Sequence, residues 1–160
     1  MPMTMSVSGM EEVEAMLHQL GEKAQDVASG ALFEGAGVVA DAFSGAINGI
    51  VAAPFKYATK GKTRYPSLEE KAALQGKSGI AHFHKNGTEV DTLIGITGSA
   101  GYVQIAGKAK AVRLIARSIN SGTSFMKKQP IFRKAASGSR GAASAAAVAK
   151  AEALLQELIK

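Results

Sequence analysis

Two histidines, His82 and His84, are the residues whose type and spacing most readily suggest chemistry. Residues two apart on a β-strand point to the same face, so the pair could fill two coordination positions of a zinc or nickel ion. Such a site needs more ligands, and Glu89 and Asp91 could complete it only if the strand register places them opposite the histidines. An exposed polar strand face accounts for the pair more simply, so we expect no metal site and no cofactor.

Two short glycine patterns resemble phosphate-binding loops. Gly61, Lys62 and Thr63 match the end of a P-loop, but Lys56 stands where that motif requires its first glycine. Residues 35–40 fit the G-x-G-x-x-A pattern, yet they lie within a helical pattern and no strand precedes them. The chain also has no cysteine and no G-x-S-x-G turn for a nucleophilic serine. We therefore expect no catalytic residues and a protein that is not an enzyme.

Charge is distributed unevenly along the chain. Seven acidic residues against two lysines give residues 1–57 a net charge of −5, so the total of +6 leaves +11 for the rest. Opposite charges suit head-to-tail contact between identical subunits or contact with a polyanion, although a solvated charged surface has the same composition. Arg113 and Arg117 share a helix face and could grip DNA phosphates without reading sequence. The candidate contacts for DNA or a neighbouring subunit are Lys60, Lys62, Arg64, Arg113, Arg117, Lys127, Lys128 and Arg133.

No signal peptide and no membrane span are expected. The first residues contain no basic cluster followed by an apolar run. The most apolar stretch, residues 46–55, is far shorter than the roughly 20 residues that a span needs. Cytoplasmic synthesis is the expectation that follows, and the absence of cysteine suits a reducing compartment.

A long amphipathic helical region is predicted over residues 8–53. Ser8 begins an S-x-x-E capping box, which favours a helix start there. The apolar stripe expected to pack against the C-terminal helix or a neighbour includes Val13, Leu17, Leu20 and Val27. Later glycines weaken the helix, so it needs tertiary support or a break near Gly21 or Gly30. Pro54 is expected to end it, because proline cannot donate the helical amide.

The middle of the chain is predicted to form a basic loop, a small antiparallel β-meander and a short helix. The loop spans residues 56–77 and includes a short helix from Ser67 to Leu74. The meander spans residues 78–106, because Asn86 and Gly87 predict a hairpin and a further strand follows at Tyr102 to Ile105. The short helix covers residues 109–120.

A second long helix is predicted over residues 129–159, with a pause near residues 138–141. Pro130 favours its start, since the first helical position has no use for an amide donor. Phe125, Ile131 and Phe132 are expected to anchor it to the sheet, while Val148 and Leu155 lie on a thin apolar stripe suited to a neighbour. The prediction is an α+β fold in one domain over residues 1–160.

Several motifs recur in a fixed order across residues 7–159. In chain order they are Val7-Ser8-Gly9-Met10, Val38-Val39-Ala40-Asp41-Ala42, Ala53-Pro54, Tyr102-Val103 leading to Gly107, and Pro130-Ile131-Phe132-Arg133-Lys134-Ala135. The set resembles the tail-completion or minor tail (head-tail joining) proteins of long-tailed bacteriophages. The chain departs from that pattern after the Ala-Pro pair, where Phe55-Lys56-Tyr57 replaces the family's frequent Thr-Gly.

The resemblance implies a structural virion protein at the head–tail neck or upper tail. It implies a homo-oligomeric ring, expected to be a hexamer, that meets other phage neck and tail proteins and encloses a lumen where DNA contact would be non-specific. Its location would be the virion, after assembly in the host cytoplasm. Two alternatives stay open: another connector, such as a stopper or tail terminator, and a basic DNA-associated prophage protein.

Overall fold

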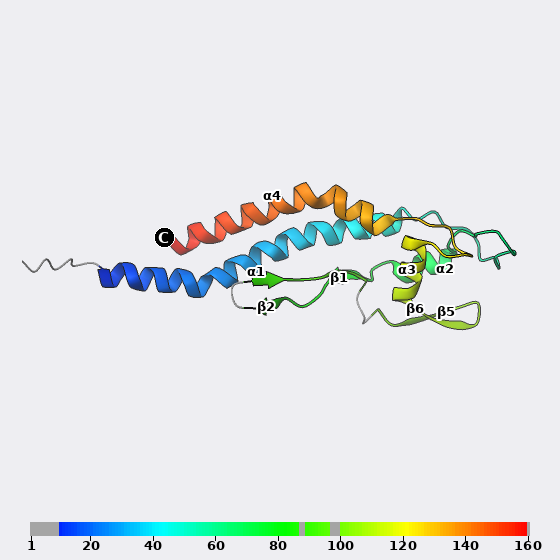
Figure 1. The fold of residues 1–160 in the computed structure, drawn as a ribbon, viewed down its shortest axis with the longest axis horizontal. Coiled ribbons are helices and arrows are strands. Elements are labelled where there is room, and N and C mark those ends of the chain that lie inside the picture. Colours follow the sequence, from blue (N-terminus) through cyan, green and yellow to red (C-terminus); the bar gives the residue numbers. More distant parts are fainter. Residues whose placement is uncertain (1–9, 87–88, 97–99, 160) are drawn as a thin grey trace, which may run out of the picture.

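Two long helices dominate the computed structural model, which describes residues 10–86, 89–96 and 100–159. Helices α1 (Met10–Asn48) and α4 (Ile131–Ile159) run side by side in opposite directions (Figure 1). Two short helices, α2 (Leu68–Leu74) and α3 (Val112–Ser121), lie near the end of α1. The chain therefore has the predicted α+β fold with a long helix at each end.

The described strands form three separate two-stranded antiparallel sheets. They are β1 (Ser78–Ile80) with β4 (Ile94–Ile96), β2 (His84–Asn86) with β3 (Glu89–Asp91), and β5 (Tyr102–Ile105) with β6 (Lys108–Ala111). The first two sheets belong to one long hairpin, because the amide of Ala81 between them donates to the Leu93 carbonyl at 2.8 Å. The predicted hairpin is confirmed, and its turn residues 87–88 lie outside the described residues.

The predicted three-stranded meander is wrong, because β5 pairs with β6 and not with β4. A two-residue turn explains the difference: Ala106 and Gly107 have φ of 51° and 75°. Positive φ at both turn positions matches the twist of a tight hairpin. Strand β6 takes residues that were assigned to the helix over 109–120, so α3 begins only at Val112.

Helix α1 is continuous through Gly21 and Gly30, so neither glycine breaks it. A Cβ added at Gly30 would lie 2.8 Å from Leu154 Cδ1, and one at Gly35 would lie 2.9 Å from the Ala143 carbonyl oxygen. These two glycines let α1 and α4 approach closely. Ser8 of the predicted capping box and the side chains of Val13, Leu17 and Leu20 lie outside the described residues.

The helix ends at Asn48, so the prediction that Pro54 ends it is wrong. Ile47 and Ile50 are 1% and 2% exposed, and both belong to the hydrophobic core.

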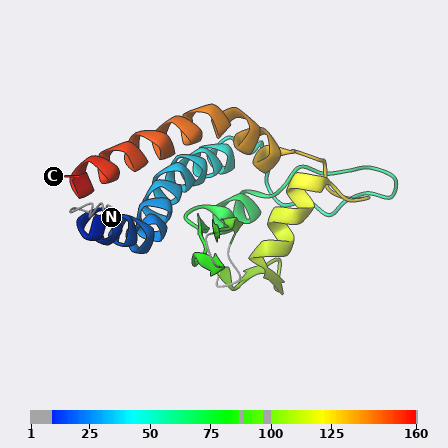
Figure 2. The same ribbon diagram turned by 60° about the vertical axis from the view of Figure 1, so that its left-hand side comes forward.

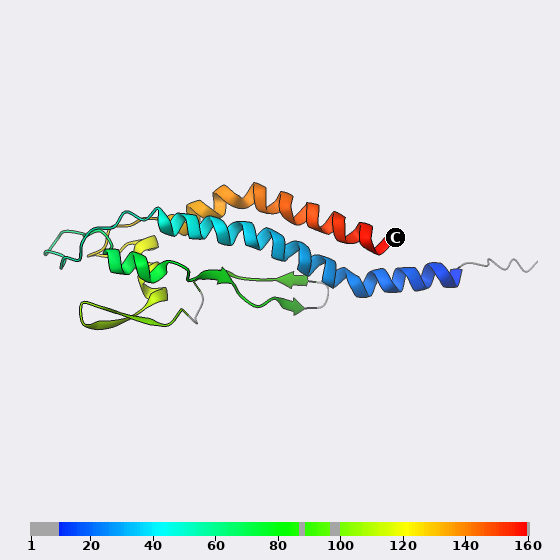
Figure 3. The same cartoon turned by 180° about the vertical axis from the view of Figure 1, so that it is seen from behind.

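The core lies where α1 ends and α2 and α3 begin, at one end of the long helical pair. Its buried members are Ile47, Ile50, Leu74, Ala100, Ile105, Val112, Ile115, Ala116, Ile119 and Met126. Beyond it, α4 continues along α1, and the hairpin that contains β1 to β4 also lies against α1 (Figure 3).

Helix α4 begins directly after Pro130 and runs without a pause at residues 138–141. Phe132 packs edge-on against Phe43 of α1, with ring centroids 5.1 Å apart, and it also borders the core. It therefore fastens α4 to α1 and the core, where the sequence predicted the sheet. Phe125 is 48% exposed, so its predicted role as a core anchor is wrong.

Candidate functional site

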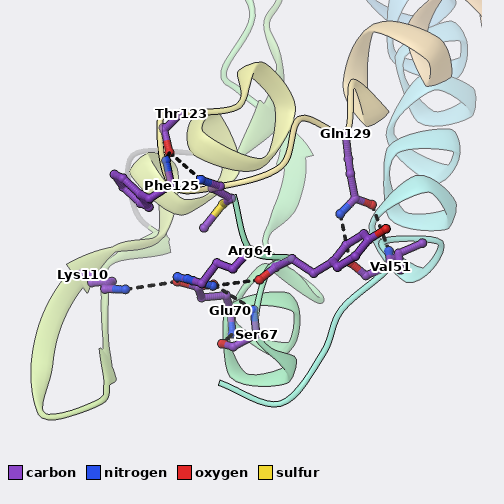
Figure 4. A network of polar contacts seen from close by, with 10 residues as sticks. Val51, Arg64, Ser67, Glu70, Lys110, Thr123, Phe125 and Gln129 are labelled. Atoms are coloured by element: carbon purple, nitrogen blue, oxygen red, sulfur yellow. Dashed lines mark hydrogen bonds and ion pairs between the residues drawn. The ribbon is translucent and has the colours of Figure 1, made fainter. Parts of the chain in front are cut away.

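A buried carboxylate, Glu70, organises the loop that precedes α2. Ser67 caps α2 by accepting a hydrogen bond from the Glu70 amide, and Glu70 accepts one from the Ser67 amide at 2.9 Å. The guanidinium of Arg64 donates to both carboxylate oxygens at 2.7 Å, and Lys110 of β6 donates at 3.1 Å (Figure 4). A bidentate arginine pair of this kind fixes geometry as well as charge.

Glu70 stays ionised at neutral pH and well into the acidic range. Its side chain is 1% exposed, and burial by itself would raise its pKa. The hydrogen bonds from Arg64, from the Ser67 amide and from Lys110 outweigh burial and lower the pKa to about 2. The hydrogen bond to Glu70 in turn raises the pKa of Arg64. The network therefore holds a fixed negative charge beneath two cations over the whole neutral range.

Backbone bridges tie the same loop to the segment that leads into α4. Arg64 donates its amide to the Phe125 carbonyl at 2.9 Å, and Lys127 donates to the Arg64 carbonyl at 2.8 Å. Further on, the Gln129 side chain both donates to the Val51 carbonyl and accepts from the Val51 amide. Figure 2 shows the loop after α1 and the segment before α4 projecting from the same end of the molecule. The two connections therefore support each other.

Two adjoining hollows open on this end and share Lys110 and Phe125. The first, of about 270 Å³, has Phe55 and buried Ile105 in its lining together with Arg64 and Lys108. The second, of about 350 Å³, lies over α3. We call their joint rim the basic-aromatic surface; it comprises Tyr57, Tyr102, Lys108, Lys110, Arg113 and Phe125.

The basic-aromatic surface exposes large rings beside unpaired cations. Tyr57 and Tyr102 are 78% and 79% exposed, and Leu114 beside them is 54% exposed. Among the described residues, Lys108 and Arg113 form no ion pair. Exposed aromatic rings and arginine around an apolar hollow are typical of protein–protein binding surfaces. No sequence pattern predicts this surface, because its rings come from separated segments that the fold brings together.

A third hollow, of about 480 Å³, lies where α4 begins. Its charged lining residues are Lys128, Arg133 and Lys134, and no carboxylate lines it. Asn120 accepts a hydrogen bond from the Phe132 amide at 3.2 Å and so caps the helix. The chain from Thr92 to Ala151 contains no acidic residue at all, whereas its basic residues are Lys108, Lys110, Arg113, Arg117, Lys127, Lys128, Arg133, Lys134, Arg140 and Lys150.

The predicted charge contacts fall into three groups. Lys60 and Lys62 are exposed in the loop, and Arg113 and Arg117 are exposed on α3. The second group lies near the start of α4: Lys127 donates to the Tyr65 hydroxyl, and Lys128 and Arg133 line the third hollow. Arg64 is the exception. Its side chain is 12% exposed and committed to Glu70, so the prediction that it contacts DNA or a subunit is wrong.

The predicted apolar helix positions do not all meet within the chain. Val148 and Leu155 of α4 are 54% and 38% exposed, whereas Leu154, the residue before Leu155, faces Gly30 of α1. Val27 is half-buried on α1. Val148 and Leu155 therefore lie away from the tightest helix contact, on a face that α1 leaves open.

The histidine pair does not lie on one strand, because only His84 belongs to β2. The strand register places His84 opposite Asp91 of β3, so one of the two predicted carboxylate ligands does face a histidine. Across the described residues, however, no group of three His, Asp or Glu side chains could hold a metal ion.

One stretch of α1, Lys23–Asn48, is long and apolar enough to cross a membrane by length and composition, with mean hydropathy 1.2. Residues 46–55, the most apolar run in the sequence, overlap only the end of this stretch. The core helix of a soluble protein passes the same test, and here α4 packs along this stretch. The feature carries no membrane assignment.

Comparison with known proteins gives no relative from which a role could be transferred. No protein-family model matches the chain, and no curated protein and no solved structure is similar to it.

Proposed function

We propose that this chain is a non-enzymatic structural protein of the virion of a long-tailed bacteriophage, acting at the head–tail neck or upper tail. The proposal rests on the ordered motifs described above, which resemble tail-completion and minor tail proteins. On this proposal it assembles with itself into a ring, with six copies expected, and meets other neck and tail proteins.

The architecture supports an assembly role through the open faces of its long helices. Among the described residues the hydrophobic core lies at one end of the helical pair, while Val148, Leu155 and Phe33 remain 38% to 56% exposed along the rest. Helices with exposed apolar positions gain free energy by packing against neighbours, at about 25 cal/mol per Å² of apolar surface buried. A ring of identical copies would supply those neighbours.

A genetic experiment tests the proposal directly. In a phage or prophage that carries this gene, disruption should leave filled heads and separate tails that fail to join, visible by negative-stain electron microscopy. Complementation with the wild-type gene should restore joined particles. Normal virions after disruption would overturn the proposal.

The alternative of a basic DNA-associated protein is favoured by the acid-free stretch from Thr92 to Ala151. Light scattering of the purified protein, with and without duplex DNA at two salt concentrations, separates the two. A monomer that binds DNA and is released steeply by salt would favour the DNA-associated protein, because phosphate contacts release counterions. Rings that form without DNA would favour the neck protein. Another connector, such as a stopper or tail terminator, would differ in the particle that accumulates.

A further inference from the structure

We propose that the basic-aromatic surface is a docking site for the N-terminal part of α1 from a second copy of this chain. This inference rests on the proposed self-assembly and names its contact faces. It follows from three features: the chemistry of the surface, the composition of α1, and the positions of the two at opposite ends of the molecule.

The surface is complementary to a ligand that is both acidic and apolar. Phe55 and Ile105 form an apolar part of the first hollow, and Ile115 of α3 borders the second. Around them stand Lys108 and Arg113, which form no ion pair among the described residues. A nucleic-acid backbone would satisfy the cations but would leave the apolar floor uncovered. An amphipathic acidic helix satisfies both.

The first part of α1 has that composition. Between Met10 and Glu22 it carries four glutamates and no lysine or arginine. The sequence spaces Met10, Val13, Leu17 and Leu20 as one apolar helical stripe. By the same spacing Glu14 borders that stripe, and Glu11, Glu12 and Glu22 stand away from it. At 1.5 Å per residue this stretch spans about 20 Å, which is enough to cross both hollows.

The chain's own α4 does not cover this part of α1. Leu154 lies opposite Gly30, and the helices run in opposite directions, so α4 reaches its last residues before the first turns of α1. Figures 1 and 3 both show α1 continuing past the C-terminal end of α4. The basic-aromatic surface lies at the other end of the long axis. One molecule therefore cannot make this contact with itself, and two molecules can make it head to tail.

A contact of this kind is heterologous, so each copy offers one face and accepts another, and repetition closes a ring or extends a filament. A single short helix buries less than the roughly 1,200 Å² of a stable interface. We therefore expect one contact to be weak and closure of the ring to be needed for stability, with Val148 and Leu155 available to widen the contact between neighbouring copies.

Charge-swap variants of the full chain test the inference. Lys108→Glu with Arg113→Glu reverses the surface, and Glu11→Lys with Glu14→Lys reverses the helix. Each should weaken self-association by about 100-fold or more, because like charges brought together in an interface cost several kcal/mol. A 1:1 mixture of the two variants should associate again, since each then offers one native and one reversed face of complementary charge. Arg140→Glu with Lys150→Glu, exposed on α4 and outside both hollows, is the control of equal charge change.

Sedimentation velocity across a concentration series, with circular dichroism to verify folding, gives the readout. If the wild type forms rings and the surface variant self-associates equally well, the docking inference is overturned and the proposed function stands. Folded variants that fail alone and are not rescued by mixing would also overturn the docking inference. Loss of duplex-DNA binding with assembly intact would assign the surface to nucleic acid instead. A wild-type chain that stays monomeric at every concentration would remove the ring from the proposed function, and the docking inference with it.

Discussion

Replacing Glu70 with glutamine should destabilise the fold by about 3 kcal/mol at neutral pH. Glutamine keeps the shape and an oxygen that can accept from the Ser67 amide, but it removes the charge that Arg64 and Lys110 face. Lowering the carboxyl pKa from its ordinary 4.5 to about 2 corresponds to about 3 kcal/mol of preference for the ionised form. Removing one partner of a buried pair costs a similar amount, because Arg64 stays behind uncompensated.

The stabilisation by Glu70 depends on pH in a defined direction. The pKa of Glu70 is lowered by folding, so its contribution is fully present above about pH 4.5 and is lost as the pH falls toward 2. Urea unfolding should therefore show a large gap between wild type and Glu70→Gln at pH 7, and a gap that closes between pH 4.5 and pH 2. Glu69→Gln, on the adjacent exposed position of α2, is the matched control and should change stability by less than about 0.5 kcal/mol. Equal effects at the two positions, or a gap that does not close in acid, would refute the reasoning.

Four further substitutions test other parts of the structure, each by urea unfolding. Phe132→Ala should cost roughly 3 kcal/mol or more, because it removes the ring that packs on Phe43, whereas Phe125→Ala should cost much less; equal losses would contradict the assigned anchor. Gly35→Ala should destabilise by about 1 kcal/mol or more, since its methyl would meet the Ala143 carbonyl oxygen at 2.9 Å. Gly45→Ala should stabilise α1 by about 1 kcal/mol, because no atom lies within 4 Å of the added methyl group. A change in stability of the same sign at both glycines would contradict this prediction.

The elements with strong local signals could be predicted from the sequence. The cap at Ser67 has its glutamate at the third helical position, and α2 begins beside it as predicted. Pro130 stands directly before α4. The long helices and the hairpin before and after Asn86 follow from periodicity of 3.6 and from turn chemistry.

What could not be predicted depends on which segments meet. The pairing of β5 with β6 uses an alanine at positive φ, which no turn rule favours at Ala106. A helix is predicted over residues 109–120, but it begins only at Val112 because the residues before it belong to β6. In so short a run an alternating pattern and a helical pattern cannot be distinguished. Arg64 looked like one more loop cation. Only the fold places it against Glu70, and local sequence carries no signal of that pairing.

The acid-free stretch from Thr92 to Ala151 has an energetic consequence for any role of the protein. Many like charges on one region repel one another, and among the described residues of this stretch only Lys110 pairs with a carboxylate, that of Glu70. The remaining cations gain most from an external anion, whether a glutamate-rich helix of another copy or DNA phosphates. Salt distinguishes the two sources. Release from DNA follows the logarithm of the salt concentration with a slope set by the number of phosphates contacted. A docked helix that also buries apolar side chains retains part of its affinity when salt screens its charges.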